Sequence, residues 1–234
     1  MSNRVKTLFL HLISFFTDAL FPIPKAEQWI FNTPKEEIFK ILPRAFVSPI
    51  PESFGVFSYK DEHVQRLIWA IKYKKSKQAS IIAGFALHRF IKIFAQVLPT
   101  DETLPVANES QKIIVIPMPV SKQRRRERGF NQCELLTAEI KRLENAESYK
   151  IIIVNNLLIR SRHTSRQTLK DKSHREESTE GLFKVDGKIL DSKFKNMTFI
   201  IIDDVVTTGS TMKEAVSTMR KAGFTSTWGL SVAH

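Results

Sequence analysis

The chain has 234 residues, of which 42% are hydrophobic, and this is enough for one sizeable domain with its own core. Its single cysteine, Cys133, excludes a disulfide framework and a four-cysteine metal site within the chain, and predicts a reducing, cytoplasmic setting. The formal net charge is +12, and three segments, residues 60–77, 122–128 and 160–175, together carry +13. Charge gathered in this way favours a phosphate-rich ligand or a nucleic-acid backbone, with ordinary solvated helix faces as the alternative.

Residues 1–55 begin with an apolar stretch, LFLHLISFF, and continue through a segment punctuated by proline. The stretch is too short to span a bilayer and no small-residue cleavage site follows it. We therefore predict an amphipathic docking helix rather than a signal peptide, and no stable membrane span. Because the region shows little sign of an independent core, it is predicted to form a small N-terminal helical arm or hood, with residues 56–234 as the main domain.

Residues 61–97 carry apolar side chains at helical spacing, which predicts two helices on either side of the basic segment KYKKSK. Residues 98–110 are crowded with proline, asparagine and acids, and are predicted to be a linker. After them, short apolar runs alternate with longer polar or helical segments. These runs are IIVI (113–116), IIIV (151–154), FIII (199–202) and TWGLSVA (227–233). Such an alternation predicts an α/β fold, a parallel sheet flanked by helices, whose ligand lies beyond the carboxyl ends of the strands.

The run FIII leads directly into two acids, Asp203 and Asp204, and then into a loop rich in hydroxyl-bearing residues. A helical pattern over 212–223 follows, so the loop ends at a helix N-terminus, which favours an anion. The loop residues predicted to bind a 5′-phosphate are Thr207, Thr208, Gly209, Ser210 and Thr211. The carboxylates are suited to sugar hydroxyls or to Mg²⁺, so a ribose 5-phosphate satisfies both parts. The alternative is an ordinary strand-to-helix turn in which the acids only cap the helix.

The stretch IIIDDVVTTGST resembles the phosphoribosyl-pyrophosphate (PRPP) motif of type I phosphoribosyltransferases. The segments IPMPVSKQRRRERGFNQ and RSRHTSRQTLKDKSHR, the second followed by GLF, resemble the ComF family of phosphoribosyltransferase-like proteins, which are linked to competence and DNA uptake. VQRLIWAIKYKKSK is similar to that family's upstream helix with its Lys-Tyr pair. The resemblance covers residues 55–234 and implies a type I phosphoribosyltransferase fold, with Asp203 and Asp204 as the catalytic carboxylates.

The resemblance also assigns roles to two other segments. PMPVS (117–121) and the residues after it would hold the pyrophosphate, since arginine binds phosphate oxygens in bidentate fashion. The candidates there are Ser121, Arg124 and Arg128. Residues 160–175 match the mobile loop that closes over PRPP in type I enzymes. The candidates in that loop are Arg162, Gln167 and Lys170. An exposed basic helical turn and a solvated linker are the respective alternatives.

The implied reaction is transfer of the phosphoribosyl group from PRPP to an unknown nitrogen acceptor. Mg²⁺ is expected to be held through PRPP, with Asp203 or Asp204 as a candidate ligand, and to stabilise the departing pyrophosphate. No protein nucleophile is required, so Cys133 is predicted to be a packing residue. Many ComF proteins carry an N-terminal zinc module of paired cysteines, but DALFPIPKAEQWIFNTPKEE occupies that place here without one. A zinc site is therefore not carried over.

A second class of function remains open. The protein would then be a non-catalytic accessory of DNA uptake that binds PRPP or single-stranded DNA, with proteins of the competence machinery as partners. Aromatic residues near the positive segments, Trp69, Tyr73 and Phe130, allow a groove that stacks bases and follows the phosphate backbone. A pyrophosphate pocket accounts for much of the same charge.

Overall fold

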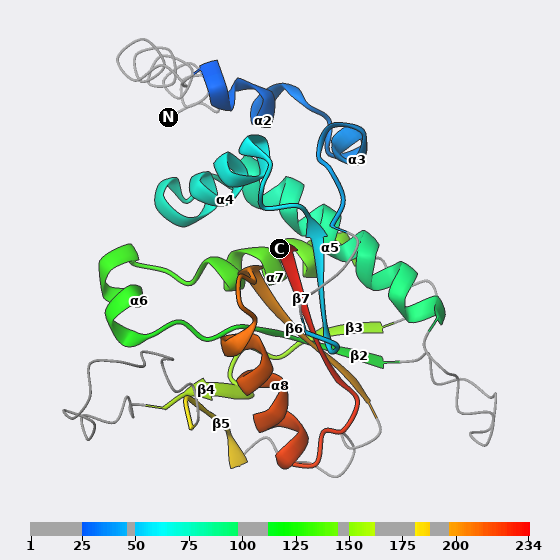
Figure 1. The fold of residues 1–234 in the computed structure, drawn as a ribbon, viewed down its shortest axis with the longest axis vertical. Coiled ribbons are helices and arrows are strands. Elements are labelled where there is room, and N and C mark those ends of the chain that lie inside the picture. The colour runs from blue at the N-terminus through cyan, green and yellow to red at the C-terminus, as the bar shows by residue number, and fades with distance from the viewer. Residues whose placement is uncertain (1–24, 46–49, 98–111, 145–149, 162–180, 188–196) are drawn as a thin grey trace, which may run out of the picture.

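The computed structural model describes residues 25–45, 50–97, 112–144, 150–161, 181–187 and 197–234 (Figure 1). The helical segments in this part of the chain are η1 (Lys25–Glu27), α2 (Gln28–Asn32), η2 (Lys35–Glu37), α3 (Ile38–Ile41), α4 (Glu62–Lys74), α5 (Lys77–Val97), α6 (Lys122–Arg128), α7 (Gln132–Leu143) and α8 (Ser210–Lys221). The strands are β1 (Ser53–Phe57), β2 (Lys112–Pro117), β3 (Lys150–Ile153), β4 (Leu158–Arg160), β5 (Phe183–Val185), β6 (Thr198–Val205) and β7 (Thr227–Ala233).

Five of these strands form one parallel sheet in the order β1-β7-β6-β2-β3. The four apolar runs are its strands β2, β3, β6 and β7, so the predicted α/β fold with a helix-flanked parallel sheet is confirmed. The edge strand β1 was not predicted, because it follows a proline-rich stretch and carries a glycine in its centre. The domain boundary expected between residues 55 and 56 lies inside this strand.

The strand β6 lies in the middle of the sheet and is buried on both faces. Ile200 and Ile202 belong to the apolar core that contains the buried residues of α4, α5 and α7. Phe199 and Ile201 alternate with them and pack into a second core against α8. Helices therefore cover both faces, with α8 on the side opposite α5 (Figure 1). This double burial explains why an uninterrupted apolar run marks the strand in the sequence.

The helices α4 and α5 confirm the pair predicted between residues 61 and 97. Asp61 caps α4, because its Oδ1 accepts hydrogen bonds from the backbone N–H groups of His63 and Val64, at 2.9 and 3.1 Å. Lys75 ends the helix in a left-handed conformation with φ of 50°. In the part of the chain that the structure covers, no helix is both long enough and apolar enough to cross a bilayer.

Residues 25–42 pack onto the main domain. Ile30, Ile38 and Leu42 are buried in the same core as α4 and α5. The predicted docking helix and the linker at 98–110 lie outside the described residues.

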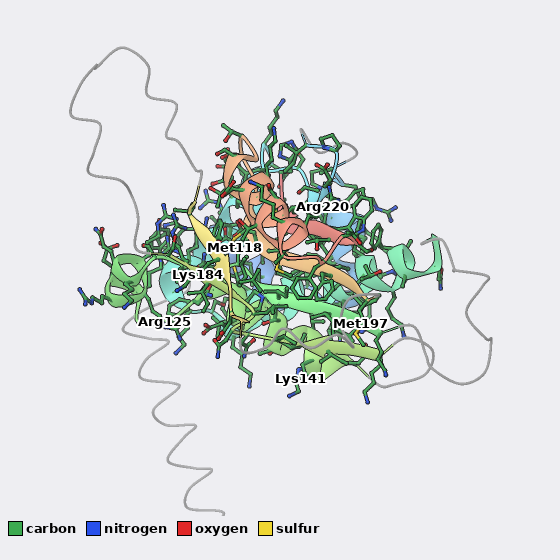
Figure 2. The ribbon with its side chains drawn as sticks, turned by 90° about the horizontal axis from the view of Figure 1, so that it is seen from below. Met118, Arg125, Lys141, Lys184, Met197 and Arg220 are labelled. Atoms are coloured by element: carbon green, nitrogen blue, oxygen red, sulfur yellow. The ribbon has the colours of Figure 1, made fainter. Side chains whose placement is uncertain are left out.

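The short strands β4 and β5 form a separate antiparallel hairpin. Leu158 and Phe183 of this hairpin are buried in the core that contains α8. Seen from below, the hairpin lies beside α8, and Lys184 marks its position (Figure 2). Residues 162–180, which connect the two strands, lie outside the described residues.

Candidate functional site at the carboxyl ends of the strands

A cavity of about 440 Å³ lies at the carboxyl ends of β2 and β6, where a parallel sheet is expected to bind its ligand. Nine of the residues predicted from the sequence are among those that line it: Arg124, Arg128, Asp203, Asp204, Thr207, Thr208, Gly209, Ser210 and Thr211. The polar residues of the wall that were not assigned to the site are Tyr59, Lys72, Tyr73, Gln132 and Arg160. The loops that follow β2 and β6 are far apart in the sequence, but both contribute residues to the wall of this cavity.

The hydroxyl-rich loop leads directly into the N-terminus of α8. Gly209 is the residue before the helix, and its φ of 80° belongs to the left-handed region that favours glycine. A Cβ at this position would lie 3.0 Å from Cγ2 of Ile50, so the Ile50 side chain would have to shift to admit it. The helix α8 receives no side-chain cap from Gly209, and its first backbone N–H, that of Ser210, donates only a long hydrogen bond of 3.5 Å to Oγ1 of Thr208. Its first N–H groups are therefore available to an anion, a contact with the helix end that contributes about 0.3–1 kcal/mol.

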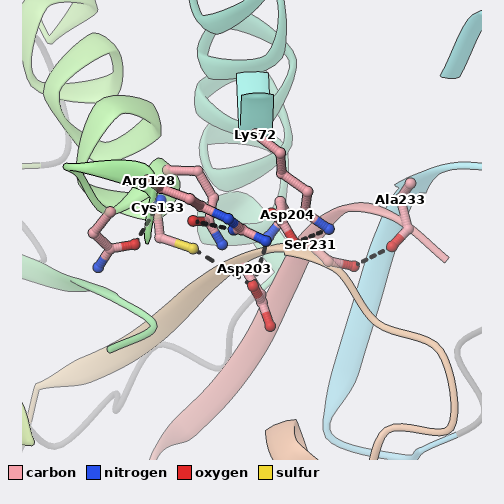
Figure 3. Close-up of polar contacts among 9 residues, drawn as sticks. Lys72, Arg128, Cys133, Asp203, Asp204, Ser231 and Ala233 are labelled. Atoms are coloured by element: carbon pink, nitrogen blue, oxygen red, sulfur yellow. Dashed lines mark hydrogen bonds and ion pairs between the residues drawn. The ribbon is translucent and has the colours of Figure 1, made fainter. Parts of the chain in front are cut away.

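The acid pair belongs to the strand and does not follow it. β6 continues through both aspartates to Val205, and Asp203 pairs in register with Ser231 of β7. The strand is thus three residues longer than the apolar run FIII, and the acids lie at its carboxyl end, as predicted. Since successive side chains of a strand point to opposite faces, the two carboxylates are directed to different neighbours (Figure 3).

Asp204 is 3% exposed and faces α4. The Nζ of Lys72 lies 3.1 Å from its Oδ1. Its Oδ2 is buried and has no hydrogen-bond partner among the described residues. Leaving a buried acceptor without a donor costs about 1–3 kcal/mol, so a ligand hydroxyl at this oxygen would remove a penalty that the empty protein carries.

Asp203 faces Cys133 at the start of α7. Its Oδ1 accepts hydrogen bonds from the Cys133 thiol, with Sγ at 3.5 Å, and from the Asp204 backbone N–H at 2.8 Å. Burial, followed by the charge of Asp204, raises the pKa of Asp203 to about 7. Burial also raises the pKa of the Cys133 thiol well above its usual value, with Asp203 adding to the shift. Cys133 is thus a neutral thiol packed in the core, as predicted.

The acid pair does not fit a directly bound Mg²⁺. Asp204 already has an ammonium group beside it, and the raised pKa of Asp203 means that this carboxyl is partly protonated near neutral pH. A divalent ion between them would have to displace Lys72 and remove a proton. In the described ranges, no group of three or more histidine, cysteine, aspartate or glutamate side chains is arranged to hold a metal ion.

The arginines of α6 are divided between the cavity and the outer surface. Arg124 and Arg128 are four residues apart, on one helix face, and line the cavity. Arg128 donates to Oε1 of Gln132 at 2.9 Å and lies over the ring of Tyr73. Arg125 is turned away and donates to both carboxylate oxygens of Glu134, at 2.6 and 3.1 Å.

Ser121 is not part of the cavity wall. It is the residue before α6, and its hydroxyl accepts a hydrogen bond from the Arg124 backbone N–H at 3.2 Å. Its contact with pyrophosphate stays a prediction, while the geometry gives it the role of fixing the start of the helix that carries Arg124 and Arg128.

Arg160 is a third arginine of the cavity. It ends β4 and opens the basic segment 160–175, which is the signal that could have identified it. Burial lowers its pKa, and the charge of Arg124 lowers it further. Two guanidinium groups close enough to disfavour each other are suited to a ligand with several negative charges. Arg162, Gln167 and Lys170, predicted from the same segment, lie outside the described residues.

Lys72 and Tyr73 come from α4, far from the other site residues in sequence. They are the Lys-Tyr pair of KYKKSK, and that resemblance was the available signal for them. Their place in the cavity depends on how α4 packs over the end of β6.

Residues 102–227 match the phosphoribosyl transferase domain family. Competence protein F of Haemophilus influenzae is 30% identical over 121 residues, which cover 51% of this chain and 50% of that protein. Competence protein ComFC of Bacillus subtilis is 30% identical over 172 residues, which cover 72% of this chain and 58% of that protein. The chain thus matches between 50% and 58% of the length of these curated relatives.

Proposed function

The chain belongs to the phosphoribosyl transferase domain family and is a ComF-like member of it, and we propose that it binds PRPP in the cavity and transfers the phosphoribosyl group to a nitrogen acceptor. The observation that carries this proposal is the buried, unpartnered Oδ2 of Asp204. This carboxylate lines the same cavity as the α8 N-terminus and the cavity arginines. A sugar with a phosphate at one end and a diphosphate at the other matches these groups.

The proposed binding mode assigns one part of PRPP to each part of the wall. The 5′-phosphate accepts hydrogen bonds from the first N–H groups of α8 and from the hydroxyls of residues 207–211. A ribose hydroxyl donates to Oδ2 of Asp204. The pyrophosphate is bound by Arg124, Arg128 and Arg160, whose side chains line the same cavity.

The reaction breaks the bond between C1 of the ribose and the pyrophosphate oxygen. The bonding electron pair leaves with the pyrophosphate, and the lone pair of the acceptor nitrogen forms the new bond to C1. Positive charge builds on the sugar in the transition state, near the negative charge of Asp204, while negative charge builds on the leaving group, near the arginines. Charges fixed in place before the reaction lower its barrier because they need no reorganisation.

We further propose that Mg²⁺ enters with PRPP, on the oxygens of the pyrophosphate, because the acid pair does not fit a direct ion. When bound, it would neutralise charge on the leaving group. PRPP titrations with and without MgCl₂ test this assignment. Asp203→Asn should leave the dependence on Mg²⁺ unchanged, and loss of that dependence in the variant would contradict it.

The decisive experiment measures binding and turnover separately. Calorimetry with PRPP tests the site, with Asp204→Asn as the variant. Pyrophosphate release, measured across candidate nucleobases, tests transfer. Tight binding without release from any acceptor would favour the second candidate function below over the enzyme.

That second candidate is a PRPP-binding accessory that holds single-stranded DNA. It is favoured by the exposed aromatic rings beside the cavity, since Trp69 is 46% and Tyr73 is 61% exposed and their ring centroids are 5.9 Å apart. Arg128 lies over Tyr73, and Lys75 lies over Phe130. Aromatic faces next to cations stack bases, at about 1–3 kcal/mol per base. The relatives are named competence proteins, which agrees with a role beside DNA uptake and its protein machinery.

A further inference from the structure

Lys72 contributes to the walls of two cavities. It lines the 440 Å³ cavity described above and also a second one of about 710 Å³, which lies between α4 and η1. Its Nζ is 3.1 Å from Oδ1 of Asp204, and the side chains of Lys72 and Asp204 are 21% and 5% exposed. The contact joins the last turn of α4 to the carboxyl end of β6, as the close-up shows (Figure 3).

The two oxygens of Asp204 are made different by this contact. A carboxylate without partners turns about its last side-chain bond, which is a broad, two-fold torsion. With Oδ1 held by an ammonium group, the turn is restricted and Oδ2 is the oxygen without a partner.

We propose that Lys72 is a positioning residue, which holds the carboxylate of Asp204 in the orientation that lets Oδ2 accept the hydrogen bond from the ribose of PRPP. This inference rests on the proposed function, because it assumes PRPP at Asp204. It goes beyond that function because it gives a role to α4, which lies outside the loops proposed to contact PRPP. In this role, α4 fixes the orientation of one carboxylate in the site.

A neighbouring lysine provides a matched comparison. Lys74 is two residues further along α4 and also forms an ion pair with a poorly exposed carboxylate. Its Nζ is 2.9 Å from both carboxylate oxygens of Glu27, whose side chain is 8% exposed. Lys74 does not belong to the wall of the 440 Å³ cavity. The two lysines thus separate the effect of losing an ion pair on α4 from the effect of losing the contact with Asp204.

The test compares Lys72→Met, Lys72→Arg and Lys74→Met in the full chain, with PRPP affinity measured by calorimetry and stability by thermal denaturation. Removing the cation beside the buried carboxylate of Asp204 is expected to weaken PRPP binding about 10- to 100-fold in Lys72→Met. Lys72→Arg, which keeps the charge and the donors, should stay within about threefold of the wild type. Lys74→Met should lower the melting temperature and leave PRPP affinity within the same threefold.

A double-mutant cycle identifies the partner through which Lys72 acts. If Lys72 works through Asp204, Lys72→Met should cause no further loss of affinity in an Asp204→Asn background. Wild-type affinity in Lys72→Met, an equal loss in Lys74→Met, or full additivity in the cycle would each overturn the inference. A wild-type chain that binds no PRPP would instead overturn the proposed function, and this inference with it.

Discussion

Asp203 and Asp204 are consecutive in β6, yet one accepts a hydrogen bond from a buried thiol and the other forms an ion pair with a lysine. The alternation of side chains along a strand produces this division. It gives two adjacent acids different electrostatic surroundings, since the pKa of Asp203 is raised to about 7, mainly by burial, while Asp204 has a cation 3.1 Å away. We therefore expect the two acids to contribute unequally to ligand binding.

The first prediction concerns this inequality. Asp204→Asn should weaken PRPP binding by about 100-fold, because a charged acceptor is replaced by an amide beside Lys72. Asp203→Asn should cost about tenfold or less, since that carboxyl is already partly neutral near pH 7. The double substitution should abolish binding. Calorimetry with PRPP measures all three.

Glu127→Gln is a suitable control for this series. Glu127 lies on α6, is exposed and does not line the cavity. If it matched Asp204→Asn in its loss of affinity, the effect would not be specific to the site. Equal losses in Asp203→Asn and Asp204→Asn would contradict the inequality itself.

The second prediction follows from the raised pKa of Asp203. The pKa of an aspartate carboxyl is about 3.8 in the unfolded chain and about 7 for this group in the folded chain. Between these values the folded state binds more protons than the unfolded state, so this group's contribution to the free energy of unfolding falls as the pH rises. It is fully present below pH 3.8 and lost above pH 7.

Asp203→Asn removes this titrating group, so the melting temperature of the variant should fall less than that of the wild type as the pH rises towards 7. Melting temperatures of the ligand-free protein from pH 5 to pH 8 measure the effect. The variant should gain stability relative to the wild type as the pH rises through this range. Parallel profiles for the two proteins would show that Asp203 does not titrate there.

A sequence pattern predicts the strands whose burial requires a run of apolar residues. Strands β2, β3 and β6 contain uninterrupted apolar runs, and β7 is buried along almost its whole length, so the sequence marks these four. β1 was missed because a short edge strand with Gly55 inside it gives no such run. The hairpin strands β4 and β5 have only three residues each, which is too short for any period to appear.

The candidate site divides in the same way. The acids and the phosphate loop are contiguous in sequence, so the sequence alone predicts a site for a sugar phosphate there. The partners of the acids were not, because Lys72 and Cys133 reach β6 only through the packing of α4 and α7. Ser121 shows the converse case, in which a polar residue in the right segment serves as a helix cap.

The third prediction concerns the loop before α8. Gly209→Ala places a Cβ at a φ of 80° and 3.0 Å from Ile50, so both the backbone and the packing beneath the loop are strained. We expect a loss of about 1–3 kcal/mol in the free energy of unfolding. PRPP and ribose 5-phosphate affinities should both fall by at least tenfold, because the N–H groups that bind the 5′-phosphate move.

Gly223→Ala supplies the control at the other end of α8. Its φ of 97° carries the same backbone penalty, but a Cβ there would meet no atom within 4 Å. Stability should fall and ligand affinity should not. A loss of ribose 5-phosphate affinity in Gly223→Ala as large as in Gly209→Ala would show that the effect comes from general destabilisation.

The fourth prediction concerns nucleic acid. If single-stranded DNA follows the cationic and aromatic surface beside the cavity, its affinity should fall steeply with salt, because phosphate contacts release counterions. Tyr73→Ala should weaken it by about 1–3 kcal/mol, the range measured for loss of a stacked base. Fluorescence anisotropy of a labelled oligonucleotide measures both effects. A flat salt profile would exclude a groove that follows the backbone.

The fifth prediction distinguishes residues that bind the pyrophosphate of PRPP from residues that bind its 5′-phosphate. Arg128 lines the cavity, whereas Arg125 on the same helix is engaged with Glu134. Arg128→Lys removes the bidentate geometry and keeps the charge, so PRPP affinity should fall by about tenfold. Ribose 5-phosphate, which has no pyrophosphate, should bind Arg128→Lys as it binds the wild type. Arg125→Lys should change neither affinity. A parallel loss for both ligands in Arg128→Lys would place this arginine elsewhere than at the pyrophosphate, and calorimetry with the two ligands distinguishes these outcomes.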